Sequence, residues 1–287
     1  MLYSLTTRLP AAFEGPPPAA VLTYEPPVDA EDEYAALADL VAPVVRGGDV
    51  VLAILDERTA EPLHARLQAV RSALETTRLL VHTTDLPPLA TALLVRALHE
   101  LDIEGVLPAS VIASGIRRLE DLVVGAAWLG SVSKLQHPSP SLKLHARSYL
   151  PGGGYAAVLG DEPRVVRHKN TDEPLPLPPM QPATDWRVVV GTGLADESVV
   201  EPTLGTALAG AEVVRVASRR SSVAWWGTEK LVEIACMPRA LDRLRHVVLA
   251  GAGTRACGWC GHVVATPSCP LCGAARAAAS PVSGAVT

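Results

Sequence analysis

The sequence predicts a chain of three parts: an α/β N-terminal domain, a ferredoxin-like α+β domain and a short C-terminal metal-binding segment. In the first half, apolar strands alternate with helical patterns, as they do in a parallel sheet covered by helices. The second half has the element order β-α-β-β-α, which is most of a ferredoxin-like unit. Four closely spaced cysteines then follow near the C-terminus.

Bulk composition is that of a folded protein with real cores. The chain has 287 residues, of which 48% are apolar and 19% are charged. Its net charge of −5 divides into −7 over residues 1–182 and +2 over residues 183–287. This balance argues against broad nonspecific binding to nucleic acid or anionic lipid, although a local basic patch could still bind. The bias toward Arg and Ala is typical of a GC-rich genome, and we expect a bacterial source.

The sequence gives no sign of export or of a membrane span. Prolines at 10 and 16–18 interrupt the opening segment, where a secretion signal would need an apolar stretch. The longest strongly apolar run, residues 122–132, is far shorter than the roughly 20 residues that cross a bilayer. Five cysteines, four of them in metal-binding spacing, fit a reducing compartment. We therefore expect a cytoplasmic protein with no membrane partner.

The first elements are two short strands and a helix. Residues 3–9 alternate in polarity and residues 20–24 form an apolar run, so two strands separated by a Pro-rich loop are expected. Acidic residues 31–33 precede apolar positions at helical spacing, which predicts a helix from about Asp29. Pro43 is expected to bend or end that helix.

Two strand-helix units then follow in succession. Residues 49–55 predict a buried strand and residues 63–74 carry the apolar stripe of a helix. Residues 79–81 and 89–101 repeat this order, and Pro108 opens a further helix. Short connections between alternating strands and helices predict a parallel sheet.

An antiparallel hairpin is expected to close the α/β domain, which spans residues 1–173. Within residues 141–168, the stretch 141–150 alternates in polarity and two further extended runs follow. Five prolines mark residues 174–182 as a linker and domain boundary.

The ferredoxin-like domain is expected over residues 183–250. Its strands are predicted at 186–190, 212–217 and 231–237, and its helices at Asp196–Ala209 and Pro238–Leu249. Residues 274–287 are rich in Ala, Ser and Gly, which predicts a disordered tail.

The four cysteines have the spacing of a metal site. Cys257 and Cys260 form one Cys-x-x-Cys pair, Cys269 and Cys272 form the other, and four thiolates complete a closed tetrahedral shell. Cys-Gly-Trp-Cys-Gly and Cys-Pro-Leu-Cys-Gly resemble the knuckles of the zinc-ribbon family over residues 255–273. The resemblance implies a structural zinc and no particular reaction. Iron is the alternative ion for this ligand set.

Two aspartates follow the predicted parallel strands. Asp56 and Asp85 stand where open α/β sheets place ligand-binding groups, and together they could hold magnesium. The same positions suit N-caps of the following helices, and this interpretation is favoured.

Two further groups are candidates for binding a partner or nucleic acid. One is the polar face of the strand expected at 141–150, with Lys143, His145 and Arg147. The other is a loop between two predicted strands that carries the following residues: Arg219, Arg220, Trp225 and Trp226. Arginines there could meet phosphate and indoles could stack on bases, but packing of the tryptophans inside the molecule is the favoured alternative.

The sequence thus predicts a non-enzymatic adaptor or structural subunit of a larger cytoplasmic assembly, with protein partners and zinc. The closed metal shell, the Trp-Trp loop and the Pro-rich stretch all suit docking. Nucleic-acid binding or processing through the zinc ribbon and the Arg219–Trp226 loop is the second hypothesis. A magnesium-dependent α/β enzyme is the third. A homo-oligomer is compatible with all three.

Overall fold

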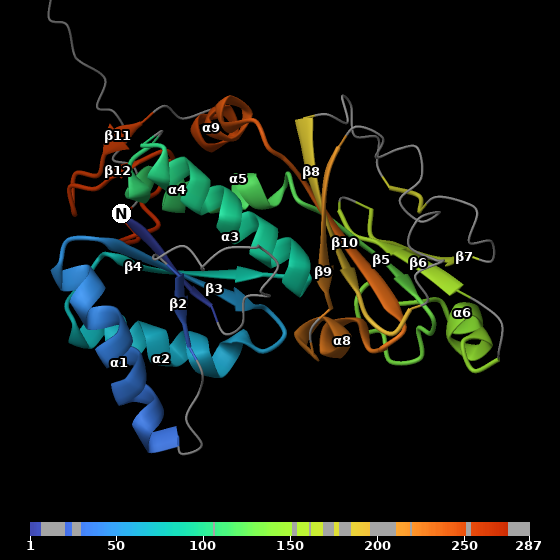
Figure 1. Cartoon of the computed structure of the whole chain (residues 1–287). Helices are drawn as coiled ribbons and strands as arrows, with labels where there is room; N and C mark the ends of the chain where they lie inside the picture. Colours follow the sequence, from blue (N-terminus) through green and yellow to red (C-terminus); the bar gives the residue numbers. More distant parts are fainter. Residues whose placement is uncertain are drawn as a thin grey trace, which may run out of the picture.

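The protein is built on two β-sheets that lie side by side, with one long helix between them (Figure 1). The computed structural model describes residues 1–6, 21–24, 30–105, 107–150, 154–160, 162–168, 175–177, 185–195, 211–218, 220–250 and 254–274. Within these residues no helix is both long enough and apolar enough to cross a membrane.

The first sheet is parallel, as the sequence predicts. Its strand order is β2-β1-β3-β4, with the following bounds: β1 Leu2–Thr6, β2 Val21–Thr23, β3 Val50–Asp56 and β4 Leu79–Thr84. Helices α1 (Ala30–Arg46) and α2 (Ala60–Ala73) cover one face. Helix α3 (Pro88–Ile103) covers the other face. Because both faces are buried, β3 is continuously apolar. Helix α1 does not end at Pro43 but continues to Arg46.

The second sheet has six strands in the order β7-β6-β5-β10-β8-β9. Their bounds are β5 Val124–Leu129, β6 Gly154–Val158, β7 Arg164–His168, β8 Trp186–Thr192, β9 Glu212–Ala217 and β10 Leu231–Pro238. Only β8 and β9 pair in parallel; the other neighbours are antiparallel.

The predicted fold class is therefore wrong, because the described strands of the expected ferredoxin-like unit belong to a larger sheet. Strand β10 lies between β8 and β5, so strands from both sides of the Pro-rich stretch share one sheet. All eight residues of β10 are buried, and the strand has a hydrogen-bonding partner on each edge. The described part of that stretch, residues 175–177, places Leu175 in the core against the sheet.

Helix α3 joins the two sheets into one core. It contacts both β1 and β10, and its apolar side chains belong to a single cluster that includes Leu52 of the first sheet and Met237 of the second. Near its N-terminus, the backbone N–H of Leu89 donates to the buried Glu233 carboxylate on β10 (3.1 Å). Burial raises the pKa of Glu233. Helix α3 is thereby fixed against the second sheet at the end where Pro88 and Thr91 line a cavity.

Two segments are helical where the sequence predicted a strand and a loop. Residues Leu142–Arg147 form α6, and the Ser141 hydroxyl caps it by accepting from the Leu144 N–H (3.3 Å). The six-residue alternation fits two helical turns as well as a strand, and the serine cap decides for the helix. Residues Arg220–Trp226 form α8 in place of the expected loop.

The cysteine segment is not a separate third unit. Its strands β11 (Arg255–Ala256) and β12 (Val263–Val264) dock on α4 (Ala109–Ser114) and α5 (Ile116–Glu120), beside α9 (Leu241–Leu249). Ser110 Oγ donates to the Val263 carbonyl (2.7 Å), and Ser114 Oγ accepts from the Ala265 N–H (2.9 Å). The three-part layout is wrong here too, since Val264 and Leu271 are buried in the core around α3. The expected helix at Asp196–Ala209 and residues 275–287 of the expected tail lie outside the described residues.

Candidate functional site

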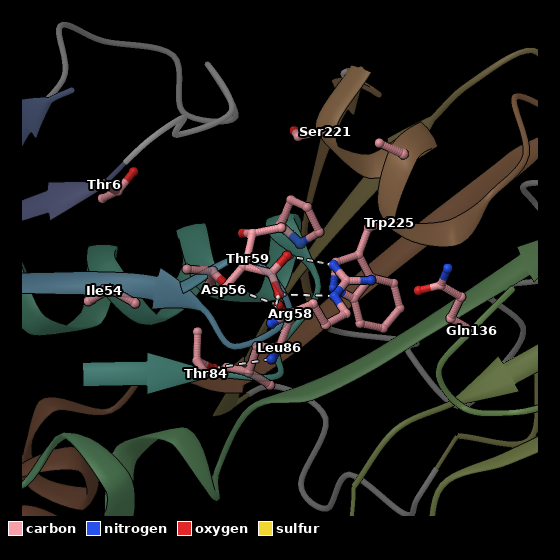
Figure 2. Close-up of a pocket in the computed structure, with 13 residues that line it drawn as sticks. Thr6, Ile54, Asp56, Arg58, Thr59, Thr84, Leu86, Gln136, Ser221 and Trp225 are labelled. Atoms are coloured by element: carbon pink, nitrogen blue, oxygen red, sulfur yellow. Dashed lines mark hydrogen bonds and ion pairs between the residues drawn. The ribbon is translucent and has the colours of Figure 1, made fainter. Parts of the chain in front are cut away.

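A cavity of about 600 Å³ opens at the carboxyl ends of the parallel strands. Thr6 ends β1, Asp56 ends β3 and Thr84 ends β4, and all three line it (Figure 2). The chain adds β2 on one side of β1 and β3 on the other, so the strand order reverses beside the cavity. Open α/β sheets bind ligands at such a reversal. The volume is within the roughly 300–1,000 Å³ of small-molecule sites.

The second sheet's elements supply the other walls of this cavity. Helix α8 contributes Ser221, Ala224 and Trp225, and the connection after β5 contributes Gln136. The start of α3 adds Pro88 and Thr91. The cavity therefore lies between the two sheets and exists only when both are assembled.

One ion pair stands in the cavity. The Asp56 carboxylate accepts from Nε (3.0 Å) and Nη2 (2.6 Å) of Arg58 and from its backbone N–H (3.1 Å). The Arg58 guanidinium also lies 4.5 Å from the centre of the Trp225 ring, where a cation–π attraction operates. Figure 2 shows Arg58 held between these two side chains. Among the described residues that line the cavity, Asp56 and Arg58 carry the only formal charges.

Hydroxyl groups make up most of the remaining polar lining. Thr91 Oγ1 donates back to the carbonyls of Leu86 and Pro87 (3.2 Å each). Thr84 Oγ1 accepts from the Leu86 N–H (3.1 Å) and donates to Glu120. Ser221 Oγ is buried and has no hydrogen-bond partner within the described structure.

A buried carboxylate network lies behind Thr84. The Glu120 carboxylate accepts from Thr84 and lies 2.8 Å from Nε2 of the buried His82. Burial by itself raises the pKa of Glu120. The hydrogen bonds from His82 and Thr84, with the positive charge of Arg117, outweigh that effect and lower the pKa below its ordinary value.

Glu120→Gln is expected to lower the free energy of unfolding at pH 7 by about 1–2 kcal/mol. Because the pKa of Glu120 is lowered in the folded state, this contribution is present above the ordinary pKa of 4.5 and disappears as the pH falls below it. Urea unfolding over a pH series measures the difference, and the exposed Glu61→Gln on α2 is the control. A difference that stays constant down to low pH would contradict this assignment.

Asp56 and Asp85 do not form a common site. Asp85 lines a second cavity of about 360 Å³, where its carboxylate lies 3.9 Å from Nε2 of His137. Neither aspartate caps a helix, because the N-cap residues of α2 and α3 are Thr59 and Pro87. The predicted capping role is wrong, and Asp56 instead positions Arg58.

The four predicted metal ligands do converge. Within the described parts of the chain, Cys257, Cys260, Cys269 and Cys272 are the one group whose potential ligand atoms gather, all within 4.8 Å of one another. Two of the sulfur pairs are 3.6 Å apart. The edge of a tetrahedron with Zn–S bonds of about 2.3 Å is close to this distance.

Both cysteine pairs lie in turns of the same form. The N–H of Gly261 donates to the Cys257 carbonyl (2.9 Å) and that of Gly273 donates to the Cys269 carbonyl (2.8 Å). Both glycines have positive φ, 74° and 77°, as their place in the turns requires. Backbone N–H groups of Cys260 and Trp259 donate to the Cys257 sulfur and lower the pKa of Cys257 to about 6. The site can hold a metal ion.

The other predicted binding residues are scattered. Trp225 and Trp226 of the expected loop are buried, Arg220 is exposed on α8, and Arg219 lies outside the described residues. The tryptophans cannot stack on bases, because they pack inside the molecule. Lys143 and Arg147 are exposed on α6 and His145 is half-buried there.

Sequence reasoning missed most of the cavity. Asp56 was noticed because it follows a strand, and Thr6 and Thr84 stand at equivalent strand ends. Arg58 gave no usable signal, and Trp225 was noticed only for a partner or for internal packing. The two residues are far apart in sequence and meet only through tertiary packing.

Comparison with known proteins gives a match in structure alone. No family model matches the sequence, and no curated protein matches it. Several solved structures resemble the fold, and three of them illustrate the likeness. The Streptococcus pneumoniae Fatty Acid Kinase (Fak) B3 protein, solved with linoleic acid, has a TM-score of 0.54 at 9% identity, covering 83% of this chain and 99% of its own.

A DegV family protein from Eubacterium eligens, loaded with heptadecanoic acid, has a TM-score of 0.53 at 9% identity over 83% of this chain and 100% of that one. A fatty-acid-binding DegV family protein from Thermus thermophilus has a TM-score of 0.51 at 13% identity, and the match covers 72% of this chain and 77% of that one. These neighbours contradict the expected adaptor or structural subunit, and they do not support the nucleic-acid alternative. The chain has the fold of the DegV family proteins.

Proposed function

We propose that this protein binds a single-chain lipid of the fatty-acid type in the cavity between its two sheets. The observation that carries the proposal is the position of the 600 Å³ cavity, at the strand reversal of the parallel sheet and under α8. The cavity has apolar lining from Ile54, Leu86 and Trp225 beside its polar groups. Solved structures of the same fold hold fatty acids, which supports a ligand of this class.

Arg58 is the proposed partner of the ligand's carboxylate. The Asp56 carboxylate accepts hydrogen bonds from Nε and Nη2 of the guanidinium. The N–H donors on Nη1 therefore remain for a second acceptor. The ion pair is partly exposed, and pairs of that kind contribute only about 0–1 kcal/mol. Asp56 and Trp225 therefore act mainly by holding the guanidinium in one place.

Ala224→Phe is expected to weaken the binding of oleic acid by at least about tenfold, because the added ring fills the cavity beside Trp225. Isothermal titration calorimetry of the delipidated full chain with oleic acid measures the affinity. Ala36→Phe, at an exposed position of α1, adds the same ring away from the cavity and should bind as the unmodified protein does.

Arg58→Gln in the same titration tests the head-group assignment. It should weaken oleic acid and leave oleyl alcohol, which has no charge, nearly unchanged. If the Ala224→Phe variant binds oleic acid and oleyl alcohol with the affinity of the unmodified protein, the cavity is not the lipid site.

For the cysteine site, we propose zinc as the bound ion. Four thiolates at tetrahedral spacing favour zinc and leave no open position for a substrate, so the ion would be structural. The thiolates must remain reduced to hold it, which fits a cytoplasmic location. Zinc would hold the turns that dock on α4, apart from the lipid cavity.

A further inference from the structure

The segment Ser141–Leu150, here called the α6 segment, exposes large apolar side chains. Leu142 is 89% exposed, and Tyr149 and Leu150 are each 68% exposed. Three of the ten exposed large apolar side chains among the described residues thus lie within ten residues of one another. An exposed apolar cluster of this kind marks an interaction surface.

The α6 segment is amphipathic in a particular way. At 100° per residue, Leu142 and Ala146 point in nearly the same direction, while Lys143 and Arg147 lie along one flank. Leu144 points to the opposite side and packs in the core cluster that contains Trp225. The segment is thus anchored through one face and presents an apolar face edged by basic residues.

The surrounding sequence carries positive charge without acidic residues. No Asp or Glu occurs between Asp121 and Asp161, whereas Lys143 and Arg147 of α6 fall in that stretch. The chain as a whole has a net charge of −5, so this cationic region is local. An apolar face with a basic edge fits the boundary between anionic headgroups and acyl chains.

We propose that the α6 segment docks this protein on the surface of an anionic lipid bilayer. Its biological purpose rests on the proposed function, because a carrier of a single-chain lipid must exchange it with a membrane. The position supports this: Gln136, in the connection that leads to α6, lines the cavity, and Leu144 packs in the same cluster as Val223 of α8. Figure 1 shows α6 at the β7 end of the second sheet, far from α9 and the cysteine segment.

Vesicle sedimentation of the full chain tests the proposal. Vesicles of equal parts phosphatidylcholine and phosphatidylglycerol should bind the protein, and vesicles of phosphatidylcholine alone should bind it much more weakly. Arg147→Glu is expected to lower the partition coefficient at least about fivefold, as loss of one basic residue at an anionic surface does. Leu142→Ser should lower it on the order of tenfold, because its apolar side chain no longer inserts.

Two matched controls keep the test specific. Arg245→Glu on α9 reverses an exposed charge, and Ile103→Ser at the end of α3 removes an exposed apolar side chain; neither should change vesicle binding. Equal binding to both vesicle types, or binding that Arg147→Glu and Leu142→Ser leave unchanged, overturns the proposal. A dimer in light scattering that Leu142→Ser dissociates also overturns it, since the face would then belong to a second copy.

The failure of docking and the failure of lipid binding give different results. Arg147→Glu should bind oleic acid in solution as the unmodified protein does. If the unmodified protein binds anionic vesicles but not oleic acid, the proposed function is wrong and the docking surface stands. If it binds oleic acid but no vesicle, only the docking surface is wrong.

Discussion

Replacing Cys269 with serine is expected to abolish the proposed zinc binding and to detach the C-terminal segment from α4. Cys269 is fully buried, and its sulfur lies 3.6 Å from that of Cys260. Metal binding contributes about 10–16 kcal/mol to the folding of isolated zinc-finger peptides, so the segment should not keep its turns with three ligands. Elemental analysis should show about one zinc per chain before the substitution and none after it.

The consequence for the rest of the molecule is visible by hydrogen exchange. Amides of residues 254–274 should lose protection, and those of α4 should follow, because Ser110 and Ser114 bond to that segment. Cys236→Ala is the matched control, since Cys236 is buried in β10 away from the other four thiols and should leave the zinc content unchanged. Unmodified protein without stoichiometric transition metal would contradict the assignment.

Trp226→Ala is expected to destabilise the protein by about 3–5 kcal/mol, the range for removing a large aromatic side chain from a core. Trp226 has no exposed surface, and its ring packs edge-on against Trp225 with centroids 4.4 Å apart. The loss should also disturb the wall of the proposed lipid cavity, because Trp225 lines it. Urea unfolding measures the stability, and the oleic acid titration measures the cavity.

Trp259→Ala provides the comparison. Trp259 is 83% exposed at the tip of the first cysteine turn, and its side chain can be removed with a change within about 0.5 kcal/mol. Equal effects of the two substitutions would show that α8 does not bury its tryptophans. The pair of variants therefore separates a core role from the surface role in nucleic-acid binding that the sequence allowed.

Local patterns were sufficient for the first sheet and for the metal ligands. Strands β3 and β4 and the helices α2 and α3 that follow them could be predicted because a strand buried on both faces is continuously apolar and each helix carries its own stripe. The cysteine ligands could be predicted because a Cys-x-x-Cys turn brings its sulfurs together within a few residues.

The second sheet could not be predicted in the same way. Strands β6 to β10 were placed near their observed positions, but β5 was not predicted. The strand partners were not predicted either, since β10 pairs with β5 across about a hundred residues of sequence. An element order that resembles a ferredoxin-like unit holds no information about such pairing. The prediction for the α6 segment was wrong for a different reason. A short stretch of alternating polarity is compatible both with a strand and with a capped helical turn.

By itself, the sequence determined which residues form most strands and helices and which four thiols can meet at an ion. Only the tertiary structure decided that the two halves share one core around α3, that Trp225 and Trp226 are buried in a separate cluster against the second sheet, and that Arg58 faces a cavity. The physical reason is that periodicity and turn spacing act over a few residues, whereas a cavity is formed by side chains whose distance in space is set by packing between distant elements.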